Sequence, residues 1–266
     1  MGRPDRAATP THMRGVDPVL EEDRKGGRTD QIAGLTWPSV SDLYINRRGP
    51  AAGLPIVFSH GMGDDSTIWD DVVAALPSAY RTIAWDLPGH GQSAELTDPN
   101  AYDARLSYAS LEALLTLEPG PVILGGHSLG GYISCRYAIE HPEKTAALIL
   151  VATGPGFRDD GARAKWNDNV RATAESSGRP AQLLGLHDDA FVIDNLERIA
   201  CPTLLIVGER DKAFLGATDY IERKLSGRPL GVTRHTIADS GHGVVRSHGA
   251  KVAQLISDFL GVALAP

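Results

Sequence analysis

The sequence predicts an α/β fold in which a mostly parallel, doubly wound sheet carries helices on both faces. Short apolar runs alternate with longer amphipathic stretches along the chain, which is the pattern of parallel strands joined by helices. The chain has 266 residues, of which 42% are hydrophobic, so it can bury one sizeable core. We therefore expect a single large domain over residues 31–266.

Each expected strand is a short apolar run bounded by turn-forming residues. These runs cover residues 54–59, 81–85, 122–126, 146–152, 203–208 and 232–237, and an edge strand is expected at 42–46. The amphipathic stretches between them predict helices at about 66–76, 103–117, 128–140, 213–225 and 244–260.

Two segments depart from this alternation. Residues 1–30 are rich in Arg, Asp, Gly and Pro, which predicts a disordered or loosely attached N-terminal arm. Residues 154–200 contain no convincing strand and follow the expected strand 146–152. Ligands bind outside the carboxyl ends of the strands in an open parallel sheet. We therefore interpret residues 154–200 as a short helical insertion over the ligand site, and call this segment the lid.

Charge and composition exclude several classes of partner. The chain carries 26 basic and 33 acidic residues, a net charge of −7, and no basic run that could follow a phosphate backbone, so nucleic acid is not expected as a partner. No apolar segment is long enough to span a bilayer, and the N-terminal stretch lacks the apolar run of a secretory signal. Cys135 and Cys201 lie in separate apolar segments and predict no disulfide framework. We expect a cytoplasmic protein without a membrane partner, whose oligomeric state is left open.

The stretch GGHSLGG places one serine among glycines directly behind an expected strand. Gly126 to Gly130 match the pattern G-x-S-x-G, with Ser128 at its centre. In a sharp turn from strand to helix, such a serine is held in a strained conformation, and its small neighbours let the two backbones pass closely. The alternative is a glycine-rich turn with an incidental serine. The strand before it and the helix after it favour a nucleophile.

A serine hydroxyl is too weakly acidic to attack a carbonyl carbon alone, so it needs a base that an acid orients. Asp211 follows the strand 203–208, and His242 follows the strand that ends at residue 237, so both lie at carboxyl ends of strands. Glu209 is a rival for the acid, and Asp239 could orient His242 locally.

The ordered set of motifs resembles the α/β-hydrolase superfamily over roughly residues 40–262. SHGMGDDSTIW at 59–69 is similar to the H-G-x segment of that family, and WDLPGHGQS at 85–93 to its D-x-x-G-x-G-x-S loop; GGHSLGG, GERD and SGHG complete the series. The resemblance implies a triad of Ser128, Asp211 and His242, because the family pattern G-x-x-D selects Asp211. It also implies an oxyanion hole made by the backbone N–H groups of Met62 and Leu129.

Other residues have weaker expected roles. Trp69, Trp166 and Phe214 are candidates to line a substrate pocket, although packing in the core or the lid explains each equally well. Asp86 and Ser93 are expected to fix the glycine-rich loop by side-chain to backbone hydrogen bonds. No His, Cys or Asp cluster has the spacing of metal ligands, so neither a metal nor another cofactor is expected.

These residues predict a serine hydrolase that cleaves carboxylic esters or a related small-molecule acyl substrate through an acyl-enzyme. Serine at the nucleophile position argues against relatives of haloalkane dehalogenases and epoxide hydrolases, which carry aspartate there. Lactones and carbon–carbon bonds remain alternative substrates, since fold and triad do not separate them. A ligand-binding protein with little or no turnover and a scaffold with an inert site are the alternatives outside enzymes.

Overall fold

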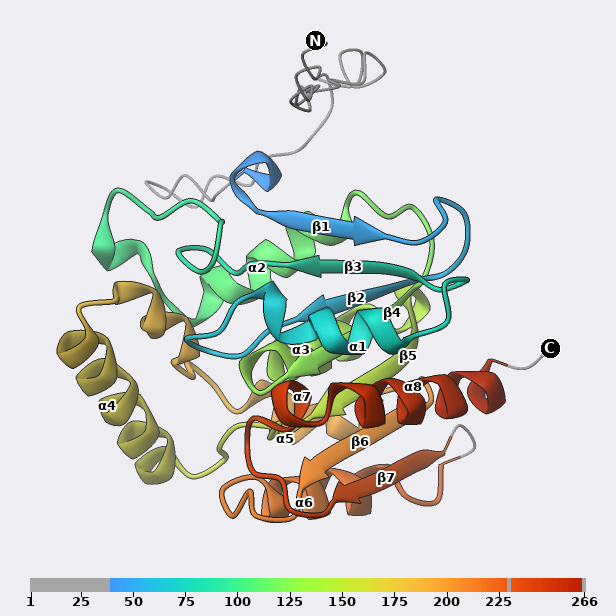
Figure 1. Cartoon of the computed structure of the whole chain (residues 1–266). Coiled ribbons are helices and arrows are strands. Elements are labelled where there is room, and N and C mark those ends of the chain that lie inside the picture. The colour runs from blue at the N-terminus through green and yellow to red at the C-terminus, as the bar shows by residue number, and fades with distance from the viewer. Residues whose placement is uncertain (1–38, 229–230, 265–266) are drawn as a thin grey trace, which may run out of the picture. The chain divides into compact units, whose positions relative to one another are not determined.

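A computed structural model describes residues 39–228 and 231–264, all within one compact unit, Trp37–Pro266. The predicted N-terminal arm at 1–30 lies outside the described residues. The unit is built around a seven-stranded sheet in the order β1-β3-β2-β4-β5-β6-β7, in which only β1 runs antiparallel to its neighbour (Figure 1). The strands are β1 (Ile45–Arg48), β2 (Pro55–Ser59), β3 (Arg81–Trp85), β4 (Val122–His127), β5 (Thr145–Val151), β6 (Thr203–Gly208) and β7 (Val232–Ile237). The predicted mostly parallel α/β sheet is confirmed.

The edge strand begins later than the sequence pattern indicates. Residues Val40–Asp42 form a short 3-10 turn, and Ser39 and Asp42 close a capping box in which each side chain accepts from the other residue's backbone N–H. This local hydrogen bonding competes with strand formation. The strand paired with β3 therefore covers 45–48 instead of 42–46.

The helices cover both faces of the sheet, as the alternation of apolar runs predicts. They are α1 (Asp70–Ala75), α2 (Ala104–Leu115), α3 (Leu129–Glu140), α4 (Asp160–Ser177), α5 (Phe191–Asn195), α6 (Leu215–Leu225), α7 (Val244–Ser247) and α8 (Gly249–Ala263). Helices α1 and α8 contribute to the core on one face, and α2, α3 and α6 to the core on the other. Side chains alternate between faces along a strand, so Val122 and Leu124 of β4 enter one core and Ile123 the other.

The helix predicted at 244–260 is divided into α7 and α8. His248 between them has φ −137° and ψ 37°, outside the helical region. Gly249 begins α8 where a Cβ atom would lie 2.6 Å from the Cβ of Asp71, so the break coincides with a close approach to α1. Among the described residues, no helix combines the length and the apolar character needed to cross a membrane.

The segment between β5 and β6 contains only helices and loops, in agreement with its sequence pattern. Helix α4 begins at the cap Asp159, which accepts from Ala162 N–H, and ends at Gly178 in the left-handed conformation (φ 62°). A 3-10 helix at Pro180–Gly185 and the short α5 follow. Figure 1 shows α4 beyond the carboxyl ends of the parallel strands.

Candidate active site

Ser128 occupies a sharp turn between β4 and α3. Its backbone has φ 52° and ψ −116°, a strained conformation for a residue with a side chain. Four hydrogen bonds hold this turn: Ser128 N–H donates to Val151 O, and Ser128 O accepts from Gly131 N–H, Tyr132 N–H and the Thr153 hydroxyl. The strain therefore persists because its surroundings fix the backbone on both sides.

The glycines around Ser128 are required by close backbone contacts. A Cβ atom on Gly126 would lie 2.3 Å from the backbone of Gly130, and one on Gly130 would lie 2.2 Å from Ser59 O. Real Cβ atoms do not approach so closely, so β4, α3 and β2 can meet here only because both positions are glycine. The pattern G-x-S-x-G is thus a packing requirement of this turn.

His242 and Asp211 form a hydrogen-bonded pair at the carboxyl ends of β6 and β7. His242 Nδ1 lies 2.9 Å from Asp211 Oδ2, and Asp211 is buried. Because the carboxylate accepts, Nδ1 carries the proton and Nε2 is left with its lone pair. Glu209, the rival acid, accepts instead from Asp239 N–H. The hydrogen bond between Asp211 and His242 is the pairing that the order of the motifs predicts.

Ser128 and His242 line the same cavity, of about 480 Å³. Within the described part of the chain, Ser128 makes no direct hydrogen bond to His242. Such contacts are often loose without substrate and tighten in the complex. Phe214 stacks on the His242 ring with centroids 4.7 Å apart and restricts its orientation.

Two residues of the cavity wall have backbone amides without a protein acceptor. Met62 lies in the loop after β2, Leu129 is the first residue of α3, and both line the cavity. In the ranges that the structure covers, neither N–H donates to another group. Gly61 adjoins the serine so closely that a Cβ there would lie 3.1 Å from Ser128 Cβ.

Two neutral histidines hold the loop that carries Met62. His60 donates from Nδ1 to Gly61 O (2.8 Å) and accepts Leu87 N–H at Nε2 (2.9 Å). His90 donates to Pro88 O and accepts Gly63 N–H at 3.2 Å. Burial, with the neighbouring His90 as the next cause, lowers the pKa of His60 to about 4, so the ring stays neutral and can accept. These rings position the loop and are not bases.

Asp86 and Ser93 fix the neighbouring glycine-rich loop, as expected. The Asp86 carboxylate accepts Ser66 N–H and Gln92 N–H at 2.6 and 2.8 Å. The Ser93 hydroxyl donates to Asp86 O and accepts Tyr44 N–H. Both side chains are hydrogen-bonded to backbone groups and are not free to take part in a reaction.

His127 connects the serine turn to the loop of His242. Its Nε2 donates to His242 O at 2.9 Å, and burial lowers its pKa to about 4, with His242 as the next cause. Asp64 pairs with Arg246 of α7 at 3.0 Å, and its carboxylate lies 3.9 Å from His127 Nδ1 without a hydrogen bond. The serine turn is thus joined to the His242 loop by His127, and the Met62 loop is joined to α7 by Asp64 and Arg246.

The cavity wall is largely apolar and comes mostly from the serine turn and the lid. Its lining residues are Met62, Ser128, Leu129, Tyr132, Thr153, Gly154, Pro155, Gly156, Phe157, Trp166, Gly185, His187, Ala213, Phe214, Ala217 and His242. Trp166 and Phe214 are among them, as proposed from the sequence.

Trp69 is a correction to the expected pocket. It is fully buried in the core beneath α1 and stacks on Phe58 with ring centroids 4.5 Å apart. Its position directly before α1 directs it toward the sheet and away from the cavity. Sequence reasoning missed Tyr132, Phe157 and His187 as wall residues, since only the folding of the lid onto α3 brings them together.

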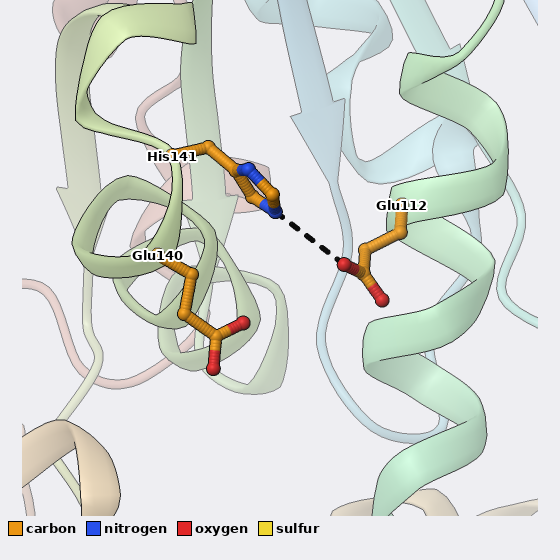
Figure 2. A group of neighbouring side chains, drawn as sticks. All are labelled: Glu112, Glu140 and His141. Carbon is orange, nitrogen blue, oxygen red and sulfur yellow. Dashed lines mark hydrogen bonds and ion pairs between the residues drawn. The ribbon is translucent and has the colours of Figure 1, made fainter.

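A separate cluster shows why spacing in the sequence is an incomplete guide to metal ligands. Glu112 of α2 faces Glu140 and His141 at the far end of α3, with donor atoms within 4.8 Å of one another (Figure 2). These groups are already partnered: His141 lies 3.4 Å from Glu112, and Glu140 accepts from the Tyr108 hydroxyl. The contacts join α2 to α3 and stand outside the cavity.

The fold and this arrangement define a class of protein. The family model of the alpha/beta hydrolase fold matches residues 55–188. The chain is 35% identical over 246 residues to 2-succinyl-6-hydroxy-2,4-cyclohexadiene-1-carboxylate synthase of an Enterobacter species, covering 80% of this chain and 94% of that protein. The chain therefore belongs to the α/β hydrolase fold family.

Other relatives match over shorter segments. A pimeloyl-[acyl-carrier protein] methyl ester esterase of Aeromonas hydrophila is 37% identical over 115 residues, which is 43% of this chain and 42% of the esterase. The chain spans only 31% of the length of an uncharacterized protein of Mycobacterium tuberculosis to which it is 38% identical. A thermophilic esterase of Thermogutta terrifontis has the same fold, with a TM-score of 0.72 at 22% identity over 84% of this chain and 94% of that one.

Proposed function

We propose that this protein is a serine hydrolase that cleaves a carboxylic ester or a related small-molecule acyl substrate through an acyl-enzyme. The observation that carries the proposal is a convergence on one cavity. The residues that line that cavity include Ser128 on its strained turn, the acid-bound His242, and two residues whose backbone amides have no acceptor within the described chain, Met62 and Leu129. Each of these groups has a distinct role in acyl transfer.

The reaction would begin when Ser128 Oγ attacks the acyl carbon and His242 Nε2 takes the hydroxyl proton. The carbonyl oxygen becomes an oxyanion, which accepts from Met62 N–H and Leu129 N–H. Asp211, held at 2.9 Å from Nδ1, stabilises the imidazolium. The bond to the leaving oxygen then breaks, and His242 returns its proton to that oxygen.

Water completes the cycle by the same groups. His242 Nε2 takes a proton from water, the hydroxide oxygen bonds to the acyl carbon, and the bond to Ser128 Oγ breaks as the serine regains its proton. The products are a carboxylic acid and an alcohol. This sequence of steps uses only groups of the chain and a water molecule, and needs no cofactor.

A relative that aligns over 80% of this chain favours a second candidate, because it is named as a synthase and not as an esterase. For the same triad, the carbon–carbon bond that the sequence leaves open is the alternative substrate to an ester. Accumulation of an acyl-enzyme during ester turnover would support the first candidate and count against the second.

The direct test is the intact mass of the protein after exposure to a small fluorophosphonate. The expected result is a single adduct on the native chain and none on Ser128→Ala, because the reagent needs both an activated serine and an oxyanion hole. Ser134→Ala, which removes a buried hydroxyl that donates to Gly130 O, is the control and should label fully. A native chain that stays unlabelled while folded would contradict the proposal.

A further inference from the structure

The wall of the cavity contains one buried polar ring for which the proposed triad has no use. His187 lies in the lid between the 3-10 helix Pro180–Gly185 and α5, and only 8% of it is exposed. His187 belongs to the lining of the cavity. The side chains around its ring are aromatic, so apart from the Tyr132 hydroxyl this imidazole is the hydrogen-bonding group of a largely apolar part of the wall.

The position of His187 is fixed by its neighbours. Asn167 of α4 accepts His187 N–H and donates to His187 O, both at 2.9 Å. The ring meets Tyr132 edge to face at 4.3 Å between centroids, and Phe157 and Trp166 also surround it. A ring held in this way presents its polar atoms in one direction at little entropic cost.

Neither ring nitrogen of His187 has a hydrogen-bond partner in the described chain. Nδ1 is sealed from solvent and unpartnered, so Nε2 is the nitrogen that can meet a bound molecule. Burial lowers the pKa of His187 to about 4, so the ring is neutral near pH 7 and carries one N–H and one lone pair. A buried N–H without a partner is rare in proteins, which favours the proton on Nε2, facing the cavity.

His187 lies on a different part of the wall from the leaving group. A leaving oxygen must receive its proton from His242, which packs against Phe214. His187 packs against Tyr132 and Trp166 instead, and Trp166 bonds to Gly185 O beside the Met62 side chain. Tyr132 follows Ser128 by one helical turn of α3, which is roughly 6 Å. A group bound at His187 is therefore several bonds from the scissile carbonyl, on the acyl side.

We propose that His187 is a specificity-determining residue that selects acyl groups carrying a second, uncharged oxygen acceptor, such as a keto oxygen, several bonds from the scissile carbonyl. Nε2–H donates to that oxygen. A plain alkyl chain leaves the N–H unpaired, and sites with such a buried polar group discriminate against ligands that lack its partner. This inference rests on the proposed function, because it names the substrate class of the same site.

The test compares 4-nitrophenyl 5-oxohexanoate with 4-nitrophenyl hexanoate, which differ by one keto oxygen in the acyl chain. The native protein should show a kcat/KM ratio of about tenfold in favour of the keto ester, as expected for one buried hydrogen bond. His187→Phe should bring the ratio to one or below, and His187→Gln, which keeps an N–H at a similar reach, should recover part of it. His235→Phe on β7, outside the cavity, is the matched control. Partial unfolding lowers the rates for both esters together. A change in the ratio of their kcat/KM values therefore reports on the contact between His187 and the keto oxygen.

Two outcomes would overturn this inference. One is an equal ratio in the native protein and in His187→Phe. The other is a His187-dependent preference that appears only when the keto oxygen is moved to the alcohol part of the ester. Failure of the proposed function is distinguishable, because neither ester would then be cleaved. In that event calorimetry with Ser128→Ala decides: methyl 5-oxohexanoate must bind more tightly than methyl hexanoate, and His187→Phe in that background must remove the difference.

Discussion

At the scale of single residues, close backbone contacts determine most of the site, because an added side chain would overlap with neighbouring atoms. Ser128 keeps an unfavourable backbone conformation because Val151, Thr153 and the first turn of α3 bond to it on both sides. Its neighbour Gly130 lies where a side chain would enter the backbone of β2. The nucleophile is thus placed by main-chain contacts and by the absence of side chains around it.

Gly130→Ala is expected to damage stability and activity together. Its Cβ would lie 2.2 Å from Ser59 O and 2.7 Å from His60 O, so either β2 or α3 must shift. Overpacking of this kind costs more than about 2 kcal/mol in the free energy of unfolding, measured in urea. Gly216→Ala in α6 is the control: no atom lies within 4 Å of its Cβ position, and alanine in a helix should stabilise by up to about 1 kcal/mol. Equal stability of the two variants would contradict the argument.

Asp211→Asn and Glu209→Gln separate the two candidate acids. Without the carboxylate at Nδ1, His242 can adopt the tautomer that protonates Nε2, and kcat should fall by a factor on the order of 10³ to 10⁴. Among the residues that the structure describes, Glu209 accepts only from Asp239 N–H, so its variant should stay within about twofold of the native rate. Steady-state ester hydrolysis gives both values. A larger loss in Glu209→Gln would transfer the role of the acid to Glu209.

At the scale of elements, helix α4 of the lid is attached to the loop 185–188 by few specific contacts. Helix α4 is mostly exposed, and only Val170 and Ala174 along it are buried. Its connection to the cavity runs through Trp166 to Gly185 O and through the double hydrogen bond between Asn167 and His187. The shape of the acyl side of the cavity therefore depends on how α4 holds the loop 185–188.

Asn167→Ala should loosen this loop. The change leaves the N–H and the C=O of His187 without partners. This lowers the free energy needed to open the segment by about 1 to 3 kcal/mol. Hydrogen exchange followed by mass spectrometry should report faster exchange over residues 180–195, with little change in the sheet. Asn169→Ala on the exposed side of the same helix should leave exchange unchanged. Identical exchange in both variants would show that the double hydrogen bond does not hold the loop.

At the scale of the whole molecule, buried neutral histidines make stability depend on pH. Burial lowers the pKa of His60, His127 and His187 from 6.5 to about 4. Between these values the unfolded chain binds more protons than the folded one, so the stability that these groups supply is present above pH 6.5 and is lost as pH falls toward 4. Each proton contributes a slope of up to about 1.4 kcal/mol per pH unit.

The free energy of unfolding should therefore fall by at least about 2 kcal/mol from pH 7 to pH 5, measured in urea at constant ionic strength. The pKa of Asp188, an exposed residue, is raised mainly by partial desolvation of its carboxyl group, and this acts weakly in the opposite direction. The same measurement on His187→Phe should give a shallower slope, because one of the three rings no longer binds a proton in the unfolded chain. Stability that is flat across this range would contradict neutral burial of the rings.

The sequence by itself determined the fold class, the order of the elements and the set of candidate groups in the site. It could do so because strands and helices have different apolar periods, and because a strained serine turn tolerates only glycine at its close contacts. From the sequence, the choice of Asp211 over Glu209, two positions away, needed the family resemblance. The structure shows Asp211 hydrogen-bonded to His242.

Only the tertiary structure decided which side chains line the cavity. Trp69 and Trp166 are both candidates from the sequence, and whether each is buried against Phe58 or packs beside His187 at the cavity depends on contacts between segments apart in the chain. The same is true of His187, whose sequence context shows nothing until the lid folds against Tyr132 and leaves its ring without a partner.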